Sequence, residues 1–249
     1  MNARQLSTGL GLATVLVIAA LLAGCAPAHT PAGPAPRPAQ SHTPSATPTP
    51  TAPPSAGTSA TATAATLAIY SAPGGTVAET LSNPQPSGAP LVLLVAATKG
   101  AWLQVDLAER PNGSTGWIKA DTVTLHSLAY SLEASTVSHT LTLYKNGALV
   151  KTFTVATGTG GTPTPHGSFY ITELLAPTNA GYGPYAFGLS AFSDALTSFG
   201  GGPGQIGLHG TDDASSIGKA VSHGCIRLAN PDITELAHLL PLGTPITIS

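Results

Sequence analysis

The sequence predicts a mainly β protein with one or two short helices, organised as two modules behind a proline-rich tether. Residues 66–125 and 126–205 carry short β signals at close spacing, separated by Pro, Gly and Asn turns. Only residues 230–240 show a clear helical pattern. A chain of 249 residues is long enough for two such modules, each with a core of its own.

Residues 1–24 are predicted to be a lipoprotein signal peptide. Arg4 precedes an apolar run, Leu10 to Leu22, that is short for a membrane span and typical of a signal peptide. Leu22-Ala23-Gly24-Cys25 resembles the lipobox of bacterial lipoproteins, in which the cysteine is lipidated. The resemblance implies a lipid anchor at Cys25 in a cell-envelope membrane and an extracytoplasmic protein facing the cell wall. An ordinary secretory signal and a spanning anchor are the alternatives.

Residues 25–65 are predicted to be a tether without a core. Ten of the 23 prolines fall between Pro27 and Pro54, interleaved with Ala, Thr and Ser. Such a segment cannot bury apolar surface and prefers extended conformations. At roughly 3 Å per residue it spans on the order of 100 Å when fully extended.

Residues 66–125 are predicted to form a small β barrel. A Pro73-Gly74-Gly75 turn, an apolar run at Leu91–Val95 and the alternating segment Trp102–Leu107 give short strands at close spacing. With the Gly116-Trp117-Ile118 ending, this layout resembles bacterial SH3-like domains, which bind or position cell-wall material. The two tryptophans are expected mainly in the core.

Residues 126–249 are predicted to form a second, larger β domain. Thr140–Tyr144 alternates in polarity, Asn146-Gly147 favours a tight hairpin, and Leu149–Val155 is the return strand. Residues 176–205, rich in glycine and aromatic residues, predict a lid or binding loop, with an irregular packed excursion as the alternative.

The end of the chain predicts a helix and a final strand. Asn230 is expected to cap the helix, and Pro231 suits its first turn. Apolar side chains then fall on one helical face, namely Ile233, Leu236, Leu239 and Leu240. Pro245-Ile246-Thr247-Ile248 is typical of a strand.

The low charge and the cysteine count of the chain exclude several classes of protein. The formal net charge is −2 and only 8% of residues are charged, so there is no basic face for nucleic acid. The low charged fraction also argues against a solvated helical bundle. Two cysteines do not make a disulfide scaffold.

The residues that carry chemistry gather near Cys225. If Cys25 is lipidated, Cys225 is the only free thiol, and a thiol needs a base or a positive neighbour to become a nucleophile. His209 and His223 are both candidate bases. Each precedes a glycine, Gly210 or Gly224, that leaves room for substrate or backbone. Two residues past the thiol, Arg227 is placed to hold a carboxylate or to lower the thiol pKa. Together these residues predict a thiol acyl-transfer site.

These residues occur in a recognisable pattern. His209-Gly210-Thr211, Ser222-His223-Gly224-Cys225-Ile226-Arg227-Leu228 and Pro163-Thr164-Pro165 with Gly167 resemble the L,D-transpeptidase catalytic (YkuD-type) domain, over about residues 126–249. The resemblance implies a β-sandwich-like fold with Cys225 as nucleophile and His209 as general base. It implies that Ser222, His223 and Gly224 shape the site, with oxyanion donors from the Gly224 and Cys225 backbone. Candidate substrate-binding residues are Arg227, Gly210 and His166, the last a departure from the family pattern.

The implied reaction is the cross-linking of peptidoglycan stem peptides. The Cys225 thiolate attacks the carbonyl before the terminal D-residue of a stem tetrapeptide, and an amine acceptor then takes the acyl group from the thioester. Attack by water instead makes an L,D-carboxypeptidase. A backbone carbonyl can orient His209, so no triad carboxylate is required. No cofactor is expected. The alternatives are a zinc site of His209, His223 and Cys225, transfer of proteins onto the wall, and a non-catalytic wall-binding lipoprotein.

Overall fold

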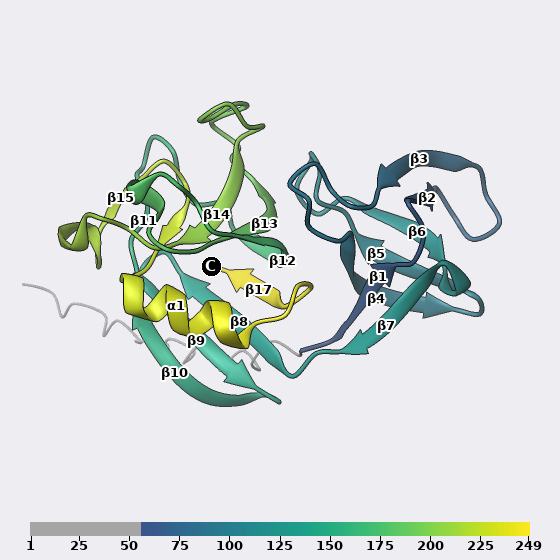
Figure 1. Ribbon diagram of the computed structural model, residues 1–249, viewed down its shortest axis with the longest axis horizontal. Helices are drawn as coiled ribbons and strands as arrows, with labels where there is room; N and C mark the ends of the chain where they lie inside the picture. Colours follow the sequence, from purple (N-terminus) through teal and green to yellow (C-terminus); the bar gives the residue numbers. More distant parts are fainter. Residues whose placement is uncertain (1–55) are drawn as a thin grey trace, which may run out of the picture. The chain divides into compact units, whose positions relative to one another are not determined.

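The computed structural model describes residues 56–249 and confirms a mainly β chain, with one α-helix in that part (Figure 1). The predicted signal peptide and Cys25 lie outside the described residues. No described helix is long and apolar enough to cross a membrane. The elements are β1 Thr58–Ala62, β2 Thr66–Tyr70, β3 Val77–Ser82, β4 Val92–Lys99, β5 Trp102–Asp106, β6 Thr115–Lys119, β7 Val123–Ser127, β8 Tyr130–Ser135, β9 Thr140–Lys145, β10 Ala148–Thr154, β11 Thr157–Gly158, β12 Gly167–Leu175, β13 Ala186–Phe192, β14 Gln205–His209, β15 Ala220–Ser222, β16 Ile226–Arg227, α1 Asn230–Leu239 and β17 Pro245–Ile248, with short 3-10 helices at Ala120–Thr122, Ala180–Tyr182 and Ala214–Ser216.

The first seven strands form one sheet in the order β3-β2-β6-β5-β4-β1-β7; we call residues 58–127 the N-terminal lobe. Alternate side chains of β2, β5 and β6 are buried, as their period-two pattern requires. They make a core of their own, to which Tyr170 of β12 contributes a fully buried ring. Trp102 and Trp117 are only half-buried and do not belong to this core, contrary to the expectation for the two tryptophans.

The start of this sheet corrects the predicted tether, which ended at residue 65. Strand β1 pairs antiparallel with both β4 and β7, and its Ala60 and Ala62 are buried. The prediction was wrong here because β1 reads Thr-Ser-Ala-Thr-Ala, the composition of the preceding tether. Its strand conformation depends on pairing with two distant strands, which local composition does not reveal.

The remaining strands form the C-terminal lobe, residues 128–249. Its main sheet has the order β10-β9-β8-β17-β12-β13-β14-β16. Strand β12 joins two halves, since its first residues pair with β17 and its last residues pair with β13, with a register shift between Ile171 and Glu173. The predicted hairpin is confirmed, with φ of 51° at Asn146 and 77° at Gly147.

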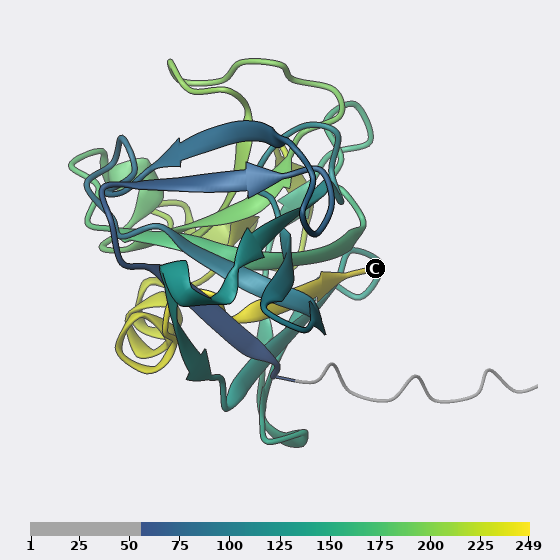
Figure 2. The same cartoon turned by 90° about the vertical axis from the view of Figure 1, so that its right-hand side faces the viewer.

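The prediction of a long loop over residues 176–205 was wrong in its middle. Residues 186–192 form β13, an inner strand between β12 and β14. Both faces of β13 are buried, so its sequence shows no alternation, and Gly188 and Ser190 further weaken the strand signal. An irregular loop remains at residues 193–204, and it projects from the sheet in both views (Figures 1 and 2).

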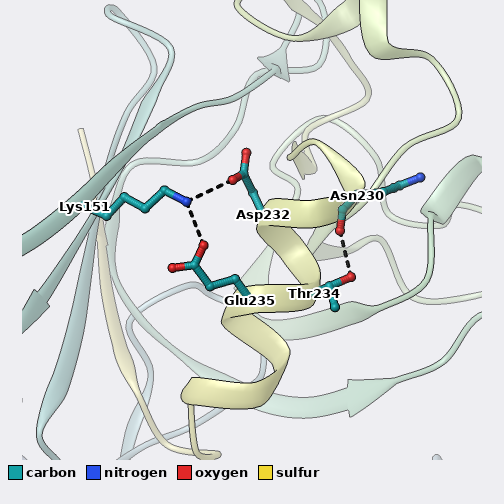
Figure 3. A network of polar contacts seen from close by, with 5 residues as sticks. All are labelled: Lys151, Asn230, Asp232, Thr234 and Glu235. Atoms are coloured by element: carbon teal, nitrogen blue, oxygen red, sulfur yellow. Dashed lines mark hydrogen bonds and ion pairs between the residues drawn. The ribbon is translucent and has the colours of Figure 1, made fainter.

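Helix α1 packs Ile233 and Leu236 into the core of the C-terminal lobe. Its outer side is tied to β10 by Lys151, whose Nζ lies 3.2 Å from Asp232 and 2.7 Å from Glu235 (Figure 3). These ion pairs are partly exposed, so each contributes about 0.5 kcal/mol to stability. The helix thereby fixes the segment that follows β16 and the site.

Candidate active site

Strands β14 and β16 bring the predicted base and nucleophile to one sheet edge. They pair in parallel, with Leu208 opposite Ile226 and His209 opposite Arg227. Cys225 directly precedes β16 and therefore lies beside Gly207, whose N–H donates to Cys225 Sγ at 3.3 Å. The fold thus brings His209 and Cys225 together, although they lie sixteen positions apart in the sequence.

Gly207 is a site residue that the sequence analysis did not identify. A Cβ built on it would lie 3.5 Å from His209 Cδ2 and 3.7 Å from Cys225 Sγ. Any side chain larger than alanine would therefore fill the space between imidazole and thiol. The available signal was a glycine inside an otherwise apolar strand, which often marks a close approach.

His209 is held as a neutral base. Its side chain is buried at 3% exposure, and Nδ1–H donates to the Gly210 carbonyl oxygen at 2.6 Å. Because a carbonyl only accepts, the proton of the neutral ring lies on Nδ1 and Nε2 keeps its lone pair. Burial lowers the pKa of His209 to about 4; the Gly210 carbonyl opposes this and the Arg227 charge adds to it.

Cys225 is half-buried and is the free cysteine of the described residues. Burial raises the pKa of its thiol, although the Gly207 N–H and the Arg227 charge act in the opposite direction. With a weakly basic imidazole nearby, the resting pair is a neutral thiol and a neutral imidazole. Proton transfer must then accompany attack on a substrate.

Arg227 is anchored through its backbone and leaves its charge for the site. Its N–H donates to the Ala156 carbonyl at 2.9 Å, and its own carbonyl accepts from Ala156 N–H at 2.8 Å. The Nε atom is buried and has no hydrogen-bond partner in residues 56–249. A buried guanidinium N–H without a partner favours an anionic ligand.

The turn before the nucleophile corrects one predicted role. Ser222 Oγ donates to the Cys225 carbonyl at 2.6 Å and accepts from Gly224 N–H at 3.1 Å. Gly224 N–H is therefore occupied and is not an oxyanion donor, contrary to the prediction. The Cys225 N–H has no partner within the described chain and remains available. Ser222 thus links the Gly224 N–H and the Cys225 carbonyl of this turn.

Gly224 itself needs to be glycine. Its φ is +118°, and a Cβ there would lie 2.9 Å from Ile206 Cδ1. Its carbonyl accepts from Thr164 Oγ1 at 2.8 Å, and Thr164 Oγ1 in turn accepts from Gly158 N–H at 2.9 Å. The threonine of the Pro163-Thr164-Pro165 loop therefore fastens the turn that carries the nucleophile.

Thr164→Val is expected to lower the free energy of unfolding by about 1–3 kcal/mol, because it leaves two buried backbone groups without partners. Urea unfolding of the variant would measure this. Thr142→Val, which removes an outer-face hydroxyl bonded to Thr152 at 3.3 Å, is the control and should cost much less. Equal losses in the two variants would contradict the fastening role.

Gly210 has a packing role in place of the predicted substrate contact. It is buried, and a Cβ there would collide with Asn230 Oδ1 and lie 3.0 Å from Gly183 Cα. Asn230 was predicted to cap α1, but no side-chain cap bond is present. Its Oδ1 instead accepts from Thr211 N–H at 2.9 Å and so fixes the segment after His209.

The two remaining predicted site residues are His223 and His166, and only the first lies beside the Cys225 thiol. His223 is exposed and its ring stacks on Phe199 at 5.1 Å between centroids, beside the thiol. His166 is also exposed, but its Nε2 lies 2.9 Å from Thr136 Oγ1, and it does not line either cavity around Cys225. The structure therefore does not bring His166 together with the site.

Two cavities meet at the thiol. One, of about 270 Å³, runs past Glu173 and the 193–204 loop. The other, of about 280 Å³, is lined by Asn179, His223 and Arg227. Both share four lining residues: Tyr182, Phe199, His209 and Cys225. The Tyr182 ring lies 4.7 Å from that of His209, so the base sits at the junction.

The alternative of a zinc site receives no support from this arrangement. Within residues 56–249 no three His, Cys, Asp or Glu side chains lie close enough together to hold a metal ion. His209, His223 and Cys225 therefore do not form a ligand set.

Comparison with known proteins shows which family the chain is similar to. The YkuD family, described as the L,D-transpeptidase catalytic domain, matches residues 129–248. A Bacillus subtilis protein named L,D-transpeptidase YkuD is 38% identical over 124 residues, which cover 50% of this chain and 68% of that protein. Its Bacillus licheniformis counterpart is 38% identical over 123 residues, 49% of this chain and 67% of that protein. A solved L,D-transpeptidase from Mycobacterium tuberculosis H37Rv aligns over 64% of this chain and 90% of its own, with 18% identity and a TM-score of 0.43.

Proposed function

The chain belongs to the YkuD family of L,D-transpeptidases and is an acyltransferase of that type. From this premise we propose that it cross-links peptidoglycan stem peptides through a thioester on Cys225. The substrate is a stem tetrapeptide, which loses its terminal D-residue, and the acceptor is an amine on a neighbouring stem. No ATP and no cofactor take part.

The observation that carries the proposal is the meeting of two cavities at Cys225 and His209. A transferase must hold an acyl donor and an acceptor on opposite sides of the reacting carbonyl, whereas a hydrolase needs a site for the donor alone. Two cavities of similar size that share the thiol and the base therefore favour transfer over hydrolysis.

Acylation begins from the neutral pair. As Cys225 Sγ attacks the carbonyl before the D-residue, its proton moves to His209 Nε2, which has a free lone pair. The oxygen of the tetrahedral intermediate takes the negative charge, and the Cys225 N–H is the available backbone donor. The proton then passes from His209 to the departing amine of the D-residue, leaving a thioester.

Deacylation uses the same groups in reverse order. The acceptor amine attacks the thioester and gives a proton to His209, an amide bond forms, and the proton returns to Cys225 as the sulfur departs. The energy of the original peptide bond is thus retained in the thioester. Exclusion of water by the buried surroundings of His209 favours the amine over hydrolysis.

The charges of the two cavities suggest which substrate each one holds. Arg227 lines one cavity, where its unpartnered guanidinium suits the terminal carboxylate of the donor. Glu173 lines the other, and its side chain makes no ion pair in the described part of the chain. Gly188 lies under this carboxylate and leaves it room. A carboxylate there suits the ammonium group of an acceptor.

Glu173→Gln is expected to lower the ratio of cross-linked to hydrolysed product about tenfold, because the amide loses the charge that attracts the acceptor. The rate of acyl-enzyme formation should stay unchanged. Chromatography of products from a tetrapeptide muropeptide would give both quantities. Glu133→Gln, which alters a carboxylate bonded to Tyr144, is the control. An unchanged ratio, or a loss of acylation, would remove the acceptor assignment.

The same product analysis separates the alternatives. Free D-residue and shortened monomer without cross-links would identify an L,D-carboxypeptidase. If the acyl group of an added wall fragment is transferred to the amine of a protein in place of a stem amine, the site attaches proteins to the wall. Cross-linked dimers with release of one D-residue each are the result that the proposal expects.

We also propose that the protein is held in the cell envelope by lipidation of Cys25, with the N-terminal lobe serving as an SH3-like domain that positions cell-wall material. The lipobox and the proline-rich tether support this placement. Cys25→Ser is expected to release the protein from membranes into the soluble envelope fraction. Retention of that variant on membranes would count against the anchor.

A further inference from the structure

One wall of the active site is the loop of residues 193–204, whose own hydrogen bonds run from the Ala195 and Leu196 N–H groups to Ser193 Oγ and between Phe199 and Gly202. Residues 193–204 leave β13 and return to β14, and Ser193 N–H donates to the Gly204 carbonyl at 2.9 Å across its base. Phe199 from this loop stacks on His223 and lines both cavities. Four more loop residues line one of the cavities: Gly200, Gly202, Pro203 and Gly204. The position of this loop therefore decides the shape of the substrate site.

The loop is bonded to a side chain from the other lobe. Arg110, in the turn between β5 and β6, donates from Nη1 to the Pro203 carbonyl at 2.8 Å. Its Nη2 donates to the carbonyls of Ser193 and Leu196, each at 3.0 Å. One guanidinium thus joins both ends of the loop and a point between them, through charge-assisted bonds that exceed neutral ones in strength.

The loop backbone is shaped to receive this side chain. Gly204 has φ of +75°, and a Cβ there would lie 3.1 Å from Arg110 Nη2 and collide with the Leu196 carbonyl. On the inner side, the guanidinium carbon lies 4.8 Å from the centre of the Phe192 ring. Bonds, close packing and a ring contact therefore all locate the guanidinium against the loop.

Asn112 adds a second, two-way link at the end of β13. Its Nδ2 donates to the Phe192 carbonyl at 2.8 Å, and its Oδ1 accepts from Phe192 N–H at 2.8 Å. The side-chain amide thereby pairs with the last residue of the strand as another strand would. The loop therefore begins directly after Phe192, whose backbone N–H and carbonyl are both hydrogen-bonded to the N-terminal lobe.

We propose that Arg110 and Asn112 are positioning residues for the acyl-transfer site, so that the N-terminal lobe completes the substrate cavities of the C-terminal lobe. This inference deepens the proposed function and rests on it for its kinetic consequences. Neither residue touches the reacting atoms. They act by holding the 193–204 loop, and through Phe199 the wall beside the thiol. Lysine cannot replace Arg110, because one ammonium cannot span three carbonyls in this fork geometry.

The test uses the full chain with Arg110→Ala, Arg110→Lys and Asn112→Ala. Lys119→Ala is the matched control, since it removes a cation of the same lobe that lies over Tyr70 and Trp102. Three quantities are measured: amide hydrogen exchange of residues 193–204, the ratio of Cys225 reaction rates with a bulky maleimide and with iodoacetamide, and kcat and KM for acylation by a tetrapeptide muropeptide. Peptide mass analysis separates Cys225 from Cys25.

We expect faster exchange confined to the loop, a higher bulky-to-small ratio, and kcat/KM reduced about 10- to 100-fold, mainly through KM, in both Arg110 variants. Lys119→Ala should match the wild type. Unchanged loop exchange, or unchanged kcat/KM despite a loosened loop, would overturn the inference. If the wild type does not act on stem peptides, the proposed function fails, and the exchange and reagent ratio still decide whether Arg110 and Asn112 hold the wall.

Discussion

A Cys225→Ala variant is expected to form no acyl-enzyme, and its turnover of stem peptides should fall by about 10,000-fold or more. The thiol makes and breaks the bond to the substrate, and Cys225 is the free cysteine of the described residues. Intact mass after mixing with a tetrapeptide muropeptide measures this. The wild type should gain the mass of the stem minus its terminal residue, and the variant should gain nothing.

Two further variants make this result interpretable. Cys225→Ser keeps a polar atom for the Gly207 N–H bond and so controls for folding of the turn. It should also form no adduct, because a hydroxyl is far less acidic than a thiol and His209, with a pKa of about 4, is a weak base. Cys25→Ser should acylate as the wild type does. An adduct that persists in Cys225→Ala would place the nucleophile elsewhere.

The parts of the fold that could be predicted from sequence are those with local signals. Asn146-Gly147 specifies its hairpin because both residues accept positive φ, and the alternation of Thr140–Tyr144 matches one buried face. Strands β1 and β13 were missed for opposite reasons. The first resembles the tether in composition, and the second is buried on both faces and has no period.

The same division applies to the site. Cys225, His209 and Arg227 carry chemistry that their residue types reveal, and the structure brings them together at β14, at β16 and at the residue just before β16. Their supports were not predictable, because each depends on contacts between distant residues. Thr164 reaches Gly224 across sixty positions, and Arg110 reaches Pro203 across ninety-three. Gly207 contributes by lacking a side chain, which gives little signal in a single sequence.

His209→Gln is expected to slow acylation about 100- to 10,000-fold, the usual contribution of a general base. Glutamine can still donate to the Gly210 carbonyl but cannot accept the thiol proton. His223→Gln should cost less than about tenfold, because that imidazole is exposed and stacks on Phe199. Stopped-flow measurement of adduct formation compares the two. If His223→Gln proves the more damaging change, the base has been assigned to the wrong histidine.

The pKa of His209 also predicts the pH dependence of the wild type. Because burial holds that pKa near 4, the base is already neutral well below pH 7. The acylation rate should therefore stay flat from about pH 5.5 to 8 and fall as the pH drops through 4. A decline that begins near pH 6.5 would instead indicate an imidazole with an ordinary pKa, and the neutral resting pair would be wrong.

Burial of His209 should make the free energy of unfolding depend on pH. The folded protein disfavours the charged imidazole, so His209 costs nothing above its unfolded pKa of 6.5, and stability is lost as the pH falls from there through about 4. The full loss is about 3 kcal/mol. Urea unfolding at pH 7 and at pH 4 gives the drop in the free energy of unfolding for each protein. This drop should be smaller in His209→Gln than in the wild type by about that amount, because the two proteins share all other titrating groups. Equal losses would mean that His209 remains charged when buried. The low-dielectric setting that keeps the base neutral for catalysis would then be absent, and the thiol would require the Arg227 charge for activation instead.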